Sequence, residues 1–280
     1  MRIGIVAPST PIGADVVAAV DRIAAERFPG VRLDWHPQCF RSRGHFAGTD
    51  AERAAAFVEV ANDRGIDALW FARGGYGSCR IVKDVLPQLD DAAREKTYLG
   101  YSDAGFMLAG LYGLGFPRLV HGPMPADVRR EGGAAAVQRA LAWLAEETVD
   151  SLEPAVSGAG PAAAFNITVL SQMLGTPLQP DLAGHVLMLE EVSEHSYRTD
   201  RALFHITSNP AMQRLAGIRL GRCSQVPEND PAFGLSEEDV VRYWCERSGI
   251  PYLGRADIGH DADNKVVPFG TWQSGRSLRG

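Results

Sequence analysis

The sequence predicts an α/β protein: a doubly wound parallel sheet domain followed by a smaller α/β domain. Two observations lead to this prediction. Apolar strand-like segments alternate with amphipathic helical segments through the first 125 residues, which is the rhythm of βαβ units. Residues 126–160 then change character, and the alternation resumes after them. A chain of 280 residues is long enough to form two modest cores.

The N-terminal elements are expected to follow one another as strand, helix and strand. Strands are expected at 2–8, 31–37, 67–75, 97–102 and 118–123. Helices are expected between them at 14–28, 49–65, 78–89 and 103–115. Thr49 is a good N-cap for the second helix, and the third helix contains a proline break. This order favours a parallel sheet with helices on both faces.

The domain boundary is expected within residues 126–160. This region combines an Ala-rich helix at 134–147 with a loose stretch at 151–164 that is rich in Gly, Ala and Pro. We therefore predict domains at 1–125 and 161–280, joined by a linker at 126–160. Helices of the second domain are expected at 166–175, 197–206 and 236–249. Its strands are expected at 185–192, 216–223 and 251–259.

Composition and charge argue against several classes of protein. The net charge of −6 and the lack of Lys/Arg runs argue against nucleic-acid binding. No stretch approaches the roughly 18 apolar residues of a membrane span. Pro8, Pro11 and Asp15 interrupt the N-terminal apolar run, which in a signal peptide would be continuous. We therefore expect a cytoplasmic protein whose four cysteines, which lack CxxC or metal-type spacing, are thiols that serve in packing.

The strongest local signal is YLGYSDAGF, in which an apolar strand runs through Ser102 into a helix that opens at Asp103 or Ala104. A serine on such a turn resembles a nucleophile elbow. Its Oγ projects at the carboxyl end of the sheet, and the Asp103 amide points to where an oxyanion forms. The alternative is that Ser102 only caps the helix. The GxSxG motif itself is absent, because Gly105 follows Ala104 directly.

The segment RGGYG at residues 73–77 also follows an expected strand. Two consecutive glycines can bring backbone amides close to a ligand or adopt positive φ, so the loop is a candidate anion or oxyanion donor. It is not a dinucleotide fingerprint, because the GxGxxG spacing fails. A tight turn without a function is the alternative.

Two further segments carry candidate catalytic side chains. Glu190 and Glu191 end a buried strand, where one carboxylate is able to hold an imidazole. The alternative is a solvated strand terminus that pairs with Arg198 or Arg201. His260 lies in a loop with Gly and Asp after a short strand, and catalytic residues are enriched in such loops.

Taken together, these segments resemble the L,D-carboxypeptidase family, the S66 serine peptidases, which includes murein tetrapeptide carboxypeptidases and microcin C immunity peptidases. The resemblance runs over nearly the full length. Its pieces are VAPST at 6–10, FAGTDAERAAAF at 46–57, DALWFARGGYGSCRIV at 67–82, YLGYSDAGFML at 98–108, HGPM at 121–124, LGTPLQPDLAGHVLMLEEVSEHSYRTDRAL at 174–203 and IGHDADNKVVPFG at 258–270.

The resemblance implies a Rossmann-like N-terminal domain, a C-terminal α/β domain of the family's own type, and an active site in the cleft between them. It also implies a Ser-His-Glu triad, with Ser102 as the nucleophile, His260 as the base and Glu190 as the carboxylate that orients the histidine. Glu191 stays open as the triad acid, because the adjacent pair leaves the sidedness undecided.

The same resemblance suggests which backbone and side-chain groups contact the substrate. The oxyanion donors would be the amides of Asp103 and Gly75. Arg73, Gly74 and Tyr76 of the glycine loop are expected to bind the substrate, which carries several carboxylates in a murein tetrapeptide. The other cations nearest in sequence to the motifs are Arg198 and Arg201.

The implied activity is removal of the terminal D-alanine from murein tetrapeptides in cell-wall recycling, with no metal and no cofactor. The first alternative is hydrolysis of a microcin C-like peptidyl or aminoacyl nucleotide, which would give self-immunity. The second is an inactive peptide-binding module of the same fold. A nucleotide-binding protein is a weaker reading, because the P-loop lysine is absent. A homodimer is implied by the resemblance alone.

The chain departs from the family pattern at three places. It has SDAG at 102–105 where the family commonly has SDIT, which leaves the serine intact. It has AAFN at 163–166 where the family usually has GGN, so that Asn166 remains. It ends at GTWQSGRSLRG, whereas the family usually continues into another helix or strand.

Overall fold

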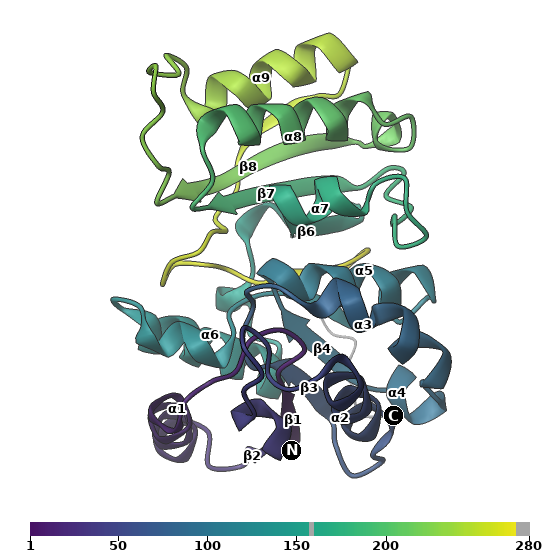
Figure 1. Ribbon diagram of the computed structural model, residues 1–280, viewed down its shortest axis with the longest axis vertical. Helices are drawn as coiled ribbons and strands as arrows, with labels where there is room; N and C mark the ends of the chain where they lie inside the picture. The colour runs from purple at the N-terminus through teal and green to yellow at the C-terminus, as the bar shows by residue number, and fades with distance from the viewer. Residues whose placement is uncertain (157–159, 273–280) are drawn as a thin grey trace.

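The computed structural model describes residues 1–156 and 160–272 and contains two sheets, each with its own helices (Figure 1). The first sheet has six strands in the order β10-β5-β4-β3-β1-β2. Their bounds are β1 Arg2–Val6, β2 Arg32–Trp35, β3 Ala68–Phe71, β4 Thr97–Gly100, β5 Leu119–His121 and β10 Val267–Pro268. All of its pairings are parallel except that of β10 with β5.

Helices cover both faces of this sheet. Helices α1 and α6 pack against each other, whereas α2 packs against α3 and α3 against α5. Their bounds are α1 Ala14–Arg27, α2 Asp50–Asn62, α3 Ser78–Val85, α4 Asp91–Arg94, α5 Gly105–Gly113 and α6 Gly133–Glu146. Strands β3 and β4 are buried along their whole length, as expected for a parallel sheet covered on both sides. The predicted doubly wound domain is therefore confirmed.

Local sequence explains where these helices begin and end. Thr49 caps α2 as predicted and forms a capping box with Glu52, which satisfies two free amides at the helix start. Helix α3 ends at Val85, and the chain continues as a 3₁₀ turn over Leu86–Gln88 at the predicted proline break.

The second sheet is parallel, with the order β6-β7-β8-β9. Its strands are β6 Ala162–Asn166, β7 Val186–Val192, β8 Gly217–Ser224 and β9 Tyr252–Arg255. Helices α7 and α8 pack together, as do α8 and α9 (Figure 1). These helices are α7 Ile167–Met173, α8 Ser196–Ser208 and α9 Glu237–Ser248. This is the smaller α/β unit that the sequence predicts.

Two strands differ from the sequence predictions. The loose stretch expected at 151–164 is wrong at its end, because β6 begins at Ala162 and all five of its residues are buried. Strand β10 was not predicted, and it returns the chain to the first sheet beside β5. The expected linker at 126–160 contains α6, which packs on α1. The last residues of the GTWQSGRSLRG segment, 273–280, lie outside the described part of the chain.

Among the residues that the structure describes, no helix combines the length and the apolar character needed to cross a bilayer.

Candidate active site

Ser102 stands at the sharp turn between β4 and α5. Its φ is +59°, a left-handed conformation that is rare outside glycine and costs on the order of 1 kcal/mol. Tyr101 before it is extended, and a 3₁₀ turn over Ser102–Ala104 leads into the helix. Ser102 makes no capping hydrogen bond in either element. The capping alternative is therefore wrong, and the strained serine has the geometry of a nucleophile elbow.

The glycine loop packs directly against this serine. A methyl group placed on Gly74 would lie 2.9 Å from both Cβ and Oγ of Ser102, so only glycine allows the contact. Gly75 has a φ of +112°. The hydroxyl of Thr10 donates a 2.8 Å hydrogen bond to the carbonyl of Gly74. The loop is thus a tight turn whose backbone packs directly against the side chain of Ser102.

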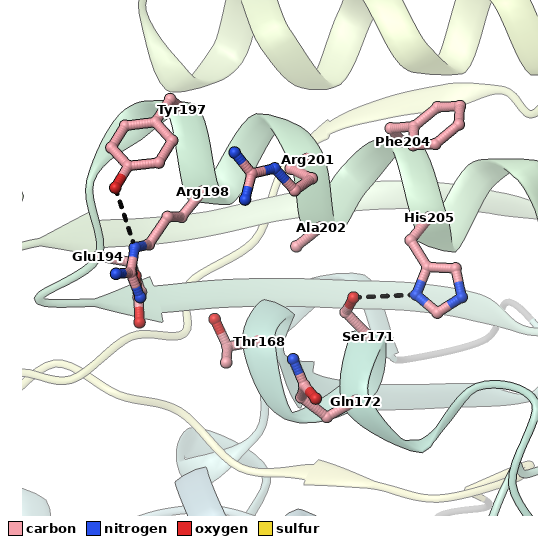
Figure 2. Close-up of a pocket in the computed structure, with 10 residues that line it drawn as sticks. All are labelled: Thr168, Ser171, Gln172, Glu194, Tyr197, Arg198, Arg201, Ala202, Phe204 and His205. Atoms are coloured by element: carbon pink, nitrogen blue, oxygen red, sulfur yellow. Dashed lines mark hydrogen bonds and ion pairs between the residues drawn. The ribbon is translucent and has the colours of Figure 1, made fainter.

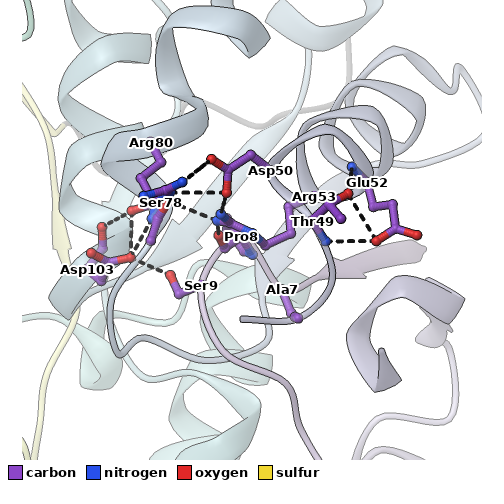
Figure 3. A network of polar contacts seen from close by, with 12 residues as sticks. Ala7, Pro8, Ser9, Thr49, Asp50, Glu52, Arg53, Ser78, Arg80 and Asp103 are labelled. Carbon is purple, nitrogen blue, oxygen red and sulfur yellow. Dashed lines mark hydrogen bonds and ion pairs between the residues drawn. The ribbon is translucent and has the colours of Figure 1, made fainter. Parts of the chain in front are cut away.

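The side chain of Asp103, the residue after Ser102, connects the turn to neighbouring loops through hydrogen bonds (Figure 3). It is buried and accepts hydrogen bonds from the amide and the hydroxyl of Ser78, each 2.8 Å long. The hydroxyl of Ser9 also donates to this carboxylate. One carboxylate therefore connects the turn after β4 with the start of α3 and with the loop after β1.

Arg53 fixes the outer side of the same loops. Its side chain is fully buried, and Nη1 donates to the carbonyls of Gly77, at 2.8 Å, and Pro8. Its other terminal nitrogen pairs with Asp50, which also binds Arg80 at 2.7 Å (Figure 3). The charge of the buried guanidinium is thus balanced by a carboxylate, and the glycine loop is held at its end.

His260 and Glu190 form a buried pair, with Nδ1 of the imidazole 2.5 Å from Oε2 of the carboxylate. His260 is 6% exposed and Glu190 is fully buried. Burial lowers the pKa of His260, but the charge and hydrogen bond of Glu190 outweigh it, so the pKa is raised above its usual value. A proton on Nδ1 leaves Nε2 free to accept another proton, which is the tautomer that a general base needs.

Local backbone irregularity lets Glu190 reach this position. The register between β7 and β8 shifts beside Glu190, and such bulges re-aim side chains near sites. Gly221 lies across from it on β8, where a methyl group would stand 3.0 Å from Cβ of Glu190 and 2.7 Å from the carbonyl of Ile258. The missing side chain at Gly221 therefore lets β7 and the His260 loop approach each other.

Glu191 faces the other way. Its carboxylate accepts hydrogen bonds from Nδ2 of Asn166 at 2.6 Å, and from the amide and hydroxyl of Thr168 at 2.8 Å each. Burial raises its pKa above the usual range. The structure thus places Glu190, and not Glu191, at the imidazole. Asn166, the remnant of the family's GGN segment, holds the second carboxylate.

The alternative that pairs these glutamates with Arg198 or Arg201 is wrong. Arg198 lies 3.8 Å from Glu194 and contacts Tyr197. Both arginines line a separate cavity of about 500 Å³ beside α7 and α8 (Figure 2). They are therefore outside the cavity that contains Ser102.

A second buried histidine, His121, stands near the same carboxylate. Burial lowers its pKa to about 4, so it is neutral at pH 7, and its ring meets the edge of Tyr101 at a centroid distance of 5.5 Å. Tyr101 in turn packs on His260 at 4.7 Å. Of these two buried histidines, it is His260 that has the direct carboxylate partner that a catalytic base requires.

Ser102, His260 and the glycine loop open into one cavity of about 410 Å³, a size typical of small-ligand sites. The lining residues are Arg73, Gly74, Gly75, Tyr101, Ser102, Met124, Ala126, Asp127, Arg129, Arg130, Val192 and His260. Of the three residues expected to bind the substrate, Arg73 and Gly74 line this cavity together with Ser102, as does Gly75, one of the two expected oxyanion donors. Tyr76 does not line the cavity: it is 50% exposed and packs near the rings of His45 and Phe46.

Sequence reasoning missed a cluster of charged residues in the segment that follows the carboxyl end of β5. Asp127, Arg129 and Arg130 all line the cavity, yet they fall in the segment expected to be a linker. The signal that could have found them is position, because loops after the carboxyl ends of parallel strands converge on one edge of the sheet. Within the described residues, no group of three or more His, Cys, Asp or Glu side chains is arranged to hold a metal ion.

Comparison with known sequences identifies relatives over most of the chain. The family model of the LD-carboxypeptidase N-terminal domain matches residues 3–122, and that of the C-terminal domain matches residues 159–274. A protein of Synechocystis sp. that carries a carboxypeptidase name is 31% identical over 235 residues, covering 81% of this chain and 76% of that protein. The murein tetrapeptide carboxypeptidase of Pseudomonas aeruginosa is 29% identical, covering 96% and 91%.

Solved structures share the fold at lower identity. The muramoyltetrapeptide carboxypeptidase from Oxalobacter formigenes superposes with a TM-score of 0.80 at 21% identity, covering 98% of this chain and 96% of the other. The microcin C7 self immunity protein MccF superposes with a TM-score of 0.78 at 19% identity, covering 96% and 91%. Both proteins therefore share the fold of this chain.

Proposed function

Because this chain belongs to the LD-carboxypeptidase family of serine peptidases, we propose that it removes the terminal D-alanine from murein tetrapeptides. In this proposal Ser102 is the nucleophile, His260 the base and Glu190 the carboxylate that orients the base. The observation that carries it is the juxtaposition in one cavity of a serine at φ +59° and an imidazole paired with a buried carboxylate.

The chemistry follows from these positions. A neutral serine hydroxyl is a weak nucleophile, so His260 takes its proton through Nε2 as Oγ of Ser102 attacks the scissile carbonyl. The imidazolium that forms is stabilised by Glu190. The amides of Asp103 and Gly75 are the proposed donors to the oxyanion. His260 then gives its proton to the leaving nitrogen, D-alanine departs, and a water molecule hydrolyses the acyl-enzyme.

Hydrolysis of a peptidyl or aminoacyl nucleotide is the competing function, and MccF has been solved with glutamyl sulfamoyl guanosine. The same triad would serve that reaction. A nucleobase needs an aromatic face on which to stack, however. Among the described lining residues the only aromatic rings are those of Tyr101 and His260, which pack on each other. This observation favours the peptide substrate.

The proposal is tested by D-alanine release from L-Ala-γ-D-Glu-meso-diaminopimelate-D-Ala in the presence of a metal chelator. We expect release by the wild type and a loss of roughly 10⁴-fold or more in kcat for Ser102→Ala. Release by neither protein, together with Ser102-dependent cleavage of an aminoacyl sulfamoyl nucleoside, would replace the proposal by the competing function.

The cytoplasmic location expected from the sequence and the homodimer implied by the family resemblance belong to this proposal as well. Sedimentation equilibrium of the purified full chain tests the dimer. A dimer has twice the chain mass of 30.2 kDa, and a measured mass equal to one chain would contradict it.

A further inference from the structure

Three arginines line the cavity that contains Ser102, and they differ in what already holds them. Arg129 makes two short hydrogen bonds to the carboxylate of Asp15, at 2.6 and 2.7 Å, so its charge is paired. Arg73 is exposed and makes one long contact, 3.4 Å, to the carbonyl of Pro11. Arg130 is the arginine that is both partly buried, with 31% of its side chain exposed, and anchored inside the cavity.

The anchor of Arg130 is Asp127, which accepts a 2.9 Å hydrogen bond from Nε. Asp127 is itself buried and accepts from the hydroxyl of Tyr101 and the amide of Met124, each at 2.8 Å. A guanidinium carries five N–H donors in a fixed plane, and this contact uses the one on Nε. Tyr101 is a second neighbour of the guanidinium. Within the described part of the chain no hydrogen bond from a terminal nitrogen of Arg130 to a carboxylate is formed, so donors on these nitrogens remain for a substrate carboxylate, and Asp127 sets the plane in which they lie.

This cluster lies beside the catalytic imidazole. The ring of Tyr101, whose hydroxyl binds Asp127, packs on the ring of His260 at 4.7 Å. The charges of Asp127 and Arg130 both act on the pKa of His260, the first raising it and the second lowering it. The guanidinium of Arg130 thus lies near the imidazole of His260, on the same side of the cavity.

The chemistry of an exopeptidase favours a cation, or other hydrogen-bond donors, at this place. The leaving residue carries its free carboxylate on the carbon next to the leaving nitrogen, so the carboxylate carbon lies about 2.5 Å from that nitrogen. His260 must deliver a proton to the same nitrogen. The terminal carboxylate of the substrate is therefore held beside the imidazole. Its burial in this partly buried cavity would cost binding free energy unless a cation or hydrogen-bond donors pair with it.

We propose that Arg130 binds the terminal carboxylate of the substrate, and that the Tyr101–Asp127–Arg130 chain makes the enzyme select for a free C-terminus. This inference rests on the proposed function and names the group that restricts it to terminal residues. Arg130 offers a planar, bidentate partner to a carboxylate. Arg129 is unable to do so while it is paired with Asp15.

The test measures binding in the Ser102→Ala background, so that it does not depend on turnover. The ligands are the tetrapeptide with a free terminal carboxylate and the same peptide with a terminal carboxamide, and binding is followed by isothermal titration calorimetry. Adding Arg130→Ala should weaken the acid by roughly 10- to 100-fold and leave the amide within about 2-fold. Adding Arg130→Lys should weaken binding of the acid peptide by less, because lysine keeps the positive charge but not the planar, bidentate guanidinium.

Arg129→Ala in the same background is the matched control, since it removes a neighbouring arginine of the same cavity and should affect both peptides alike. An equal loss of both peptides in Arg130→Ala, or no loss of the acid, overturns the assignment and makes Arg130 a structural partner of Asp127. D-alanine release by the wild type is measured separately. If the wild type releases none while acid-selective binding through Arg130 persists, the proposed function fails and the carboxylate site stands.

Discussion

Replacing Gly74 by alanine should damage the nucleophile without unfolding the protein. The added methyl group would stand 2.9 Å from Cβ and Oγ of Ser102 and 3.4 Å from Cε of Met124. The first two contacts are about 0.5 Å shorter than ordinary van der Waals contact. Ser102 has little room to yield, because its backbone is fixed at φ +59°. Overpacking of this kind costs about 1–3 kcal/mol of stability, and a displacement of half an ångström at a reacting atom also lowers the rate.

We expect kcat/KM for D-alanine release to fall by roughly 10- to 100-fold in Gly74→Ala, since a misplacement of about 1 Å costs on the order of 10². Thermal unfolding followed by circular dichroism should show a decrease in Tm of only a few degrees. Gly113→Ala is the matched control, because an added methyl there meets nothing within 4 Å. Wild-type kcat/KM in folded Gly74→Ala would refute the contact between the glycine loop and the nucleophile.

Three further predictions concern the groups around the triad. The acid limb of kcat/KM should lie above about pH 6.5, because the base must be neutral and Glu190 raises the pKa of His260. Glu190→Gln should move that limb to lower pH and reduce the plateau by roughly 10³- to 10⁴-fold; an unshifted limb would remove Glu190 from the triad. Asp103→Ala should lower the free energy of unfolding in urea by about 3 kcal/mol, because it leaves the buried amide of Ser78 unpaired. Asp103→Asn should lose less, and equal losses would show that the acceptor does not matter. Arg73→Ala should raise KM more than it lowers kcat, and an unchanged KM would show that Arg73 does not bind the substrate.

Most of the fold follows from patterns that a single sequence carries. Long apolar strands, capping residues and the proline after α3 place the elements of the first domain, because each is a local signal. Strand β6 is different, since AAAF in Ala162–Asn166 has no β-branched residue and sits in a Gly, Ala and Pro context. Strand β10 has two residues and forms only through pairing with β5. Such non-local pairing leaves no periodic signal in the sequence.

The residues of the candidate site likewise fall into those that a sequence motif indicates and those that only the tertiary structure shows. The turn at Ser102 and the loop at His260 are visible as motifs, and the structure brings both to one cavity. The choice between Glu190 and Glu191 was not accessible, because neighbouring residues of a strand point to opposite faces and only the tertiary structure shows which face meets the imidazole. Arg130 was missed because its role depends on Asp127 and Tyr101, which are close in space but carry no shared motif.

The His260 loop explains how two sheets are able to share one reaction. The loop leaves β9 in the second sheet and ends at β10, which pairs with β5 in the first sheet. Arg222 on β8 binds Asp257 and Asp261 of the loop, whereas Arg139 on α6 donates to the carbonyls of residues 262 and 264 at 2.7 and 3.0 Å. The imidazole is therefore held from both sides of the boundary that separates it from Ser102. Arg139 is not among the residues that line the Ser102 cavity. Steady-state kinetics of D-alanine release by Arg139→Ala should therefore show a lower kcat with little change in KM, because the change loosens the alignment of base and nucleophile and leaves the binding groups in place. A raised KM with an unchanged kcat would contradict this role.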